Sequence, residues 1–176
     1  MVEGTAGQWW AEALGFRPVR TIVRQVLVLA DVDGPDGSRW EVEVPAGYRL
    51  RRLRAAEAES RSQALKQRVV VAVHEESGEV AGFTETCVHP RRPDWGYQRD
   101  TAVLAAHRGH GLGRCLKADM ARWLVADCPA LERISTTTGA ENTHMIRVNE
   151  AVGYVTLRSM IAMQLPVGTE RFNGDQ

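Results

Sequence analysis

The fold is decided by the stretch Asp100–Ala126, DTAVLAAHRGHGLGRCLKADMARWLVA. Short or β-branched apolar residues at 101–104 predict a buried strand. Glycines then occupy alternate positions from 109 to 113, and a helix is predicted to follow them. Its apolar stripe comprises Leu112, Leu116, Met120, Trp123 and Leu124, and its polar face carries Arg114, Lys117 and Arg122.

A strand, a glycine-rich turn and a helix in this order can form an anion site. Glycines adopt positive φ and lack side chains, so successive backbone amides can converge on one point. The amino end of the helix adds free amides and a partial positive charge, which suits a phosphate. A turn that only reverses the chain direction explains the same pattern, so the glycines alone leave both interpretations open.

The order of residues in the turn distinguishes between the known families of phosphate-binding motif. No Gly-Lys-Ser/Thr ends it, which excludes a P-loop, and its spacing and lack of a following acidic residue exclude a dinucleotide fingerprint. The sequence Arg108-Gly109-His110-Gly111-Leu112-Gly113 resembles the Gln/Arg-x-x-Gly-x-Gly/Ala signature of the GNAT acyltransferases. The resemblance implies that these six residues wrap the pyrophosphate of acetyl-coenzyme A. It also implies that the backbone of Val103, Leu104 and Ala105 pairs with the pantetheine arm.

The sequence after the helix supports the resemblance. Residues 131–138 predict a strand, and residues 142–154 resemble the helix and glycine cap that follow in the family. Met145, Val148 and Val152 would form the buried face of this helix, and Gly153 its C-cap. By family position, Asn142 is expected to contact the coenzyme. The resemblance covers about residues 46–167 and is most specific at 98–154.

The resemblance also implies a division of catalytic roles. A backbone amide near Val103 would donate to the oxyanion, and the family's usual acid is a tyrosine where this chain has Asn149. Asparagine donates a hydrogen bond but delivers no proton. Glu85 and Asp100, on neighbouring predicted strands, are the candidate bases and could act through water. The alternative for both is a solvent-facing carboxylate or an ion pair with an arginine such as Arg99.

An internal repeat occupies the first part of the chain. Residues 11–27 align with residues 149–165, each being a helix end, a glycine, an aromatic residue and a strand. This predicts that residues 1–45 are an arm and linker resembling the last helix and strands of a preceding GNAT domain. Because its strand is apolar and has no core of its own, we expect it to dock on the remaining domain or to join two subunits in a homodimer.

Further strands are predicted at 47–53, 68–74, 80–88 and 97–105, with a hairpin turn at 76–79 and a loop at 89–97. One helix is expected at 55–67, where the family usually has two. The expected fold class is α/β (α+β), with a GNAT-type mixed, mostly antiparallel sheet flanked by helices. The acyltransferase domain would span 46–167, followed by a tail at 168–176.

Composition excludes several function classes. The chain has 176 residues, 44% of them hydrophobic, and zero formal net charge, so neither a nucleic-acid partner nor an anionic membrane surface is indicated. It lacks a long apolar run and a signal-peptide layout, and its three cysteines have no metal spacing. A cytoplasmic protein with reduced thiols and no metal is therefore expected.

The expected function is transfer of acetyl from acetyl-coenzyme A to a primary amine of a small molecule or peptide by direct attack in a ternary complex. The alternative is a non-catalytic acyl-coenzyme A-binding or interaction module left from a tandem enzyme. The arm, the short front helix and Asn149 favour that alternative.

Overall fold

The computed structural model describes residues 1–30, 39–54 and 66–166. Its helices are α1 (Ala6–Ala13), α2 (Leu112–Asp127) and α3 (Thr143–Ala151), with a 3-10 turn η2 (Ala105–His107). Its strands are β1 (Arg17–Val28), β2 (Tyr48–Arg54), β3 (Lys66–His74), β4 (Val80–His89), β5 (Arg92–Val103), β6 (Arg133–Gly139) and β7 (Val155–Gln164).

The strands form one sheet in the order β2-β3-β4-β5-β6-β1-β7. Five of its neighbouring pairs are antiparallel, and β5 with β6 is parallel. The parallel pair requires a crossover, and α2 supplies it between the two strands. The mixed, mostly antiparallel sheet flanked by helices confirms the predicted fold class.

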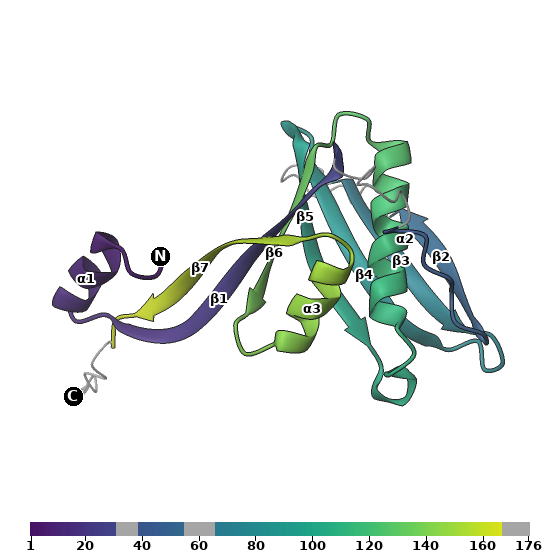
Figure 1. The fold of residues 1–176 in the computed structure, drawn as a ribbon, viewed down its shortest axis with the longest axis horizontal. Coiled ribbons are helices and arrows are strands. Elements are labelled where there is room, and N and C mark those ends of the chain that lie inside the picture. The colour runs from purple at the N-terminus through teal and green to yellow at the C-terminus, as the bar shows by residue number, and fades with distance from the viewer. Residues whose placement is uncertain (31–38, 55–65, 167–176) are drawn as a thin grey trace, which may run out of the picture.

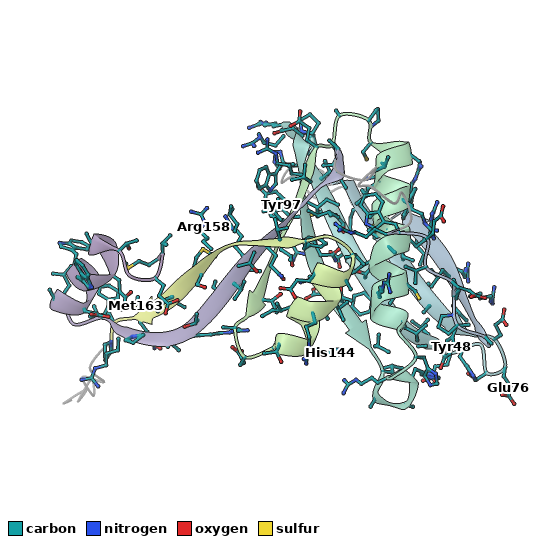
Figure 2. The ribbon with its side chains drawn as sticks, viewed as in Figure 1. Tyr48, Glu76, Tyr97, His144, Arg158 and Met163 are labelled. Carbon is teal, nitrogen blue, oxygen red and sulfur yellow. The ribbon has the colours of Figure 1, made fainter. Side chains whose placement is uncertain are left out.

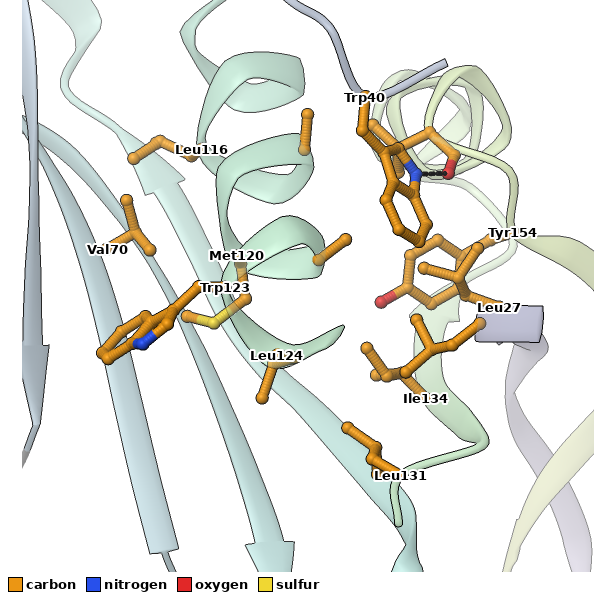
Figure 3. Close-up of a cluster of buried hydrophobic side chains, with 14 of the residues drawn as sticks. Leu27, Trp40, Val70, Leu116, Met120, Trp123, Leu124, Leu131, Ile134 and Tyr154 are labelled. Carbon is orange, nitrogen blue, oxygen red and sulfur yellow. Dashed lines mark hydrogen bonds between the residues drawn. The ribbon is translucent and has the colours of Figure 1, made fainter. Parts of the chain in front are cut away.

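Helix α2 covers one face of the sheet over β3 and β4 (Figure 1). The apolar stripe expected on it is buried throughout, with Leu116 and Leu124 fully inaccessible. Figure 3 shows this cluster beside Trp40, whose indole Nε1 donates to the Val152 carbonyl at 2.8 Å. The buried cluster as a whole joins α2 to β3, β4, β6 and the segment before β2.

One residue of the expected polar face lies elsewhere. Lys117 is 4% exposed, and its ammonium lies 5.6 Å from the centre of the Tyr154 ring. The prediction that Lys117 faces solvent is therefore wrong. The reason is that α2 is covered by the sheet on one side and by Tyr154 and its neighbours on another, so the helix is buried over more than half of its circumference.

Strand β1 lies in the sheet between β6 and β7, although it comes from the start of the chain. Its second half pairs with β6 from Ile22 opposite Gly139 to Val28 opposite Arg133. It pairs with β7 from Arg17 opposite Gln164 to Val26 opposite Val155. The first half of β1 and the end of β7 continue beyond the sheet as a two-stranded arm, with α1 at its far end (Figure 1).

The arm carries the first copy of the internal repeat. Helix α1, Gly15 at φ +87° and β1 repeat the order of α3, Gly153 at φ +99° and β7. Ile22 pairs with Met160, which is its own counterpart in the repeat. Because the two strands are antiparallel, the two units are related by a local two-fold axis near this pair.

Two predicted segments differ in the structure or fall outside its description. The loop expected at 89–97 is wrong, because β4 turns directly into β5, which begins at Arg92. Pro93 is tolerated there because it lies next to the first residue of the strand. The helix expected at 55–67 and part of the linker, at 31–38, lie outside the described residues, apart from positions 66 and 67, which start β3.

Candidate functional site

Strands β5 and β6 separate along the sheet and leave two strand edges open. Their parallel pairing covers only Trp95–Tyr97 opposite Arg133–Ser135. Beyond this point β5 keeps β4 as its partner, and β6 keeps β1. Figure 1 shows the two strands diverging toward their carboxyl ends. Residues 98–103 of β5 therefore present backbone groups that can pair with an extended ligand.

A bulge in β5 lies at the start of this open edge. Thr84 pairs with Thr101 and Thr86 with Gln98, so two residues of β5, 99 and 100, stand opposite one residue of β4. Gln98 is held in place because its Nε2 donates to the Thr84 hydroxyl at 2.9 Å and to the Glu85 carbonyl at 2.7 Å. A bulge turns the strand and ends regular pairing, which is what separates β5 from β6.

The glycine loop follows β5 and η2 and opens α2. Gly109 and Gly111 have φ of +86° and +77°, which L side chains rarely adopt. Within the described part of the chain, the backbone amides from 109 to 113 donate to no protein group, whereas Arg114 and Cys115 both donate to the Gly111 carbonyl. These free amides and the amino end of α2 are the groups that the predicted anion site requires.

The third glycine differs from the first two. A Cβ at Gly113 would lie 3.6 Å from Val148 Cγ1, which is an ordinary van der Waals contact, so this position has room for a small side chain beside α3. Leu112, the neighbouring candidate, is buried in the core. Only the first two glycines of the motif therefore depend on positive φ.

Residues just before the glycines anchor the loop to the ends of β4 and β5. The Leu104 amide donates to the Ala81 carbonyl at 2.8 Å, and Arg108 Nε donates to the Val103 carbonyl at 3.1 Å. His110 and Ala105 are exposed beside them.

Tyr48 is a loop contact that the sequence reasoning missed. Its hydroxyl lies 3.0 Å from His107 Nδ1, and its ring lies within 6 Å of the rings of His74, His107 and His110. His107 Nε2 also lies 3.5 Å from a Glu79 carboxylate oxygen. No local pattern around Tyr48 signals this, because β2 and the loop are far apart in sequence.

The two candidate bases lie at the bulge in different environments. The Glu85 side chain is 16% exposed, and Arg99 Nε lies 3.3 Å from its Oε1. This is the ion pair that the sequence offered as the alternative to a catalytic role. Asp100 is exposed, next to the open edge of β5.

Asn149 lies in the interior, away from solvent. It is fully buried, and its Nδ2 donates to Gln25 Oε1 at 2.8 Å, which ties α3 to β1. Asn142 caps α3 by accepting the Met145 amide at 3.1 Å, and it is exposed at the amino end of the helix. The two asparagines thus differ: one holds the fold together, and the other is accessible to a ligand.

Burial changes the protonation of two groups behind the loop. Desolvation lowers the pKa of Lys117 from 10.5 to about 7. Desolvation also raises the pKa of the Tyr154 hydroxyl far above its ordinary value. Near neutral pH this part of the core therefore holds a phenol and a lysine that is only partly charged.

Metal-binding clusters and membrane-spanning helices are both absent from the described ranges. No three His, Cys, Asp or Glu side chains there are arranged to hold a metal ion. None of the described helices combines the length and apolar character needed to cross a membrane.

Comparison with known proteins identifies the family. Residues 39–154 match the model of the acetyltransferase (GNAT) family, which is about two thirds of the chain. The chain therefore belongs to the GNAT acetyltransferase family, whose members are usually catalytic and typically use acetyl-coenzyme A. No curated protein sequence matches it.

Solved structures share the fold at low sequence identity. A tandem GNAT protein from the clavulanic acid biosynthesis pathway superposes with a TM-score of 0.76 at 24% identity, over 92% of this chain and 59% of its own. A GCN5-related N-acetyltransferase from Sphaerobacter thermophilus gives 0.69 at 16%, over 93% and 57%. One from Kribbella flavida gives 0.64 at 15%, over 94% and 66%. The chain thus spans about three fifths of the length of the first two.

Proposed function

We propose that this protein is an N-acetyltransferase that moves acetyl from acetyl-coenzyme A to a primary amine by direct attack in a ternary complex. The observation that carries the proposal is that free backbone amides at 109–113 lie next to the open edge of β5. The first suits a pyrophosphate and the second suits the amide-containing pantetheine arm. Both features follow from one strand, one loop and one helix.

The chain's own groups can meet most requirements of acyl transfer. Backbone amides along residues 98–103 supply donors for the oxyanion of a tetrahedral intermediate. Asp100 is the better-placed candidate base, because its exposed carboxylate lies at the bulge and could take a proton from the amine through water. Glu85 is engaged with Arg99 and would have to leave that ion pair. Asn149 is buried and has no proton to give, so the leaving thiolate would take its proton from water.

The first experiment is calorimetric titration of the purified protein with acetyl-coenzyme A, with adenosine diphosphate and NAD as controls. Gly111→Val should weaken binding strongly, because a β-branched residue does not adopt φ +77° and would distort the loop. Gly4→Ala is the matched control: Gly4 also has positive φ and open space around it, but it lies in the arm. Equal affinity of both variants for the coenzyme would contradict the proposal.

The second candidate function is a non-catalytic acyl-coenzyme A-binding module. It is favoured by Asn149, which occupies the place of the family's usual acid and is committed to Gln25. An amine screen with detection of released thiol separates the two candidates. Coenzyme binding with no turnover on any amine would favour the binding module.

A further inference from the structure

A cavity of about 480 Å³ lies on the sheet face opposite α2. Val88 points into the core beneath α2, so its neighbour Cys87 points to the other face. Tyr97 stands directly opposite Cys87 in the β4–β5 pair and shares that face. The lining residues are Cys87, His89, Arg91, Arg92, Tyr97 and Arg99.

The cavity adjoins the point where β5 and β6 separate. Tyr97 is the last residue of β5 that pairs with β6, and Arg99 stands in the bulge where the open edge begins. Figure 2 shows Tyr97 at the opposite end of the sheet from Tyr48, which contacts the glycine loop. A ligand in the cavity would therefore approach the open edge from the end away from the loop. This is the position that an acceptor needs if the coenzyme enters from the loop.

The cavity is basic. Three arginines and a histidine line it, and no lining residue is acidic. Arg99 and Arg92 each have one carboxylate partner, Glu85 and Asp94, and their side chains remain 55% and 59% exposed. In the described part of the chain, Arg91 forms no ion pair. A guanidinium presents several donors in a plane, so it retains donors for a further anion after one pairing.

The rest of the wall is neutral. Desolvation raises the pKa of the Cys87 thiol, and this outweighs the opposing effect of the Arg99 charge. Its Sγ lies 3.7 Å from the Tyr97 carbonyl. The Cys87 thiol and the Tyr97 ring thus give an uncharged floor beneath a rim of arginines. Such a surface suits a short aliphatic or aromatic chain that ends in an anion.

We infer that the amine acceptor carries a second, anionic group, a carboxylate or a phosphate, which Arg91 and Arg99 bind. Its amine then points toward the bulge and the open edge of β5. The cavity volume fits a small-molecule acceptor, because pockets for such ligands measure about 300–1,000 Å³. This inference rests on the proposed acetyl transfer for the role of the ligand, but it can be tested by binding alone.

The test uses amines that differ only in charge: 6-aminohexanoate against 6-aminohexanamide, and phosphoethanolamine against ethanolamine. Binding is measured calorimetrically with the full chain in the presence of coenzyme A, and turnover is measured with acetyl-coenzyme A. At least one anionic amine should exceed its neutral partner about tenfold in affinity, the size expected for a charge-assisted hydrogen bond. Arg91→Gln should remove most of this advantage by raising KM rather than lowering kcat.

Two further variants make the result specific. Arg99→Lys keeps the charge but loses the planar donor pair, so it should weaken the anionic amine selectively. Arg158→Gln is the control, since Arg158 is an exposed arginine on β7, separated from β5 by two strands (Figure 2). It should leave both amines unaffected.

The outcomes separate the inference from the proposed function. Arginine-dependent binding of the anionic amine without turnover would support the cavity assignment and count against acetyl transfer. Turnover of neutral and anionic amines with equal efficiency would overturn the cavity assignment and leave acetyl transfer standing. Unchanged preference in Arg91→Gln and Arg99→Lys would also overturn it.

Discussion

Replacing Lys117 with methionine should stabilise the protein, and the gain should depend on pH. The lysine is 4% exposed, and the pKa of its ammonium falls from 10.5 to about 7 because burial removes its hydration. Between these two values the unfolded chain holds a proton that the folded protein lacks. Stability therefore rises with pH across this window, and the destabilising effect of Lys117 is greatest at and below pH 7.

The two pKa values give the size of the effect. Linkage between them yields a destabilisation of about 4 kcal/mol at pH 7 and about 1 kcal/mol at pH 10. Methionine has a similar length and no charge, so Lys117→Met should recover most of this difference. Urea unfolding of both proteins at pH 6, 7, 8.5 and 10 measures it, because the difference between them cancels the titration of Tyr154 and other shared groups.

Arg114→Met is the matched control on the same helix. Arg114 is exposed, so its replacement should change the free energy of unfolding little and equally at each pH. The reasoning about Lys117 fails if Lys117→Met is no more stable than the native chain at pH 7. It fails equally if the difference between them is the same at pH 7 and pH 10, because a desolvated ammonium must produce a pH-dependent difference.

Three other variants, two single and one double, test the site and the arm. Gly82→Ala should destabilise the protein by about 1–3 kcal/mol and weaken coenzyme binding, because its Cβ would lie 2.7 Å from a carbonyl oxygen at the end of β5. Asn149→Ala should cost about 1–3 kcal/mol by leaving Gln25 buried without its partner, measured by urea unfolding. Trp9→Gln with Trp10→Gln should abolish self-association in light scattering, since these side chains are 66% and 67% exposed on α1.

Each of these predictions has a contrary outcome. Normal coenzyme affinity in Gly82→Ala would show that the end of β5 does not position the ligand. A lower kcat in Asn149→Ala with unchanged stability would restore a catalytic role for Asn149. A native chain that is monomeric at every concentration would rule out the homodimer. Deleting the arm would be a poorer test of that dimer, because it would also remove β1 from between β6 and β7.

Local patterns predicted the elements that build the site. The strand, loop and helix from 100 to 126 form as expected, because glycine spacing and helical periodicity are set within a few residues. The cap at Gly153 was equally local. Prediction from local patterns failed where segments distant in sequence come into contact. Lys117 was assigned to solvent because its own helix cannot show that Tyr154 covers it.

The arginines of the cavity were missed for the same kind of reason. Pro90 and Pro93 made residues 89–97 look like a loop, yet β5 begins at Arg92 and continues the sheet. Only the pairing of Tyr97 with Cys87 brings the flanking arginines onto one face. The ion pair between Glu85 and Arg99 is a contact between two strands that the sequence did indicate, because the two residues lie on strands predicted to be neighbours.

The position of β1 has a consequence for how the chain folds. Its two neighbours in the sheet, β6 (Arg133–Gly139) and β7 (Val155–Gln164), lie far from it in sequence. During synthesis β1 must therefore wait for both of these strands before it can pair fully, and contacts so distant in sequence slow folding. During that interval its unpaired edges can join other chains. This part of the sheet forms only when segments far apart in sequence meet, so its assembly is a late step of folding.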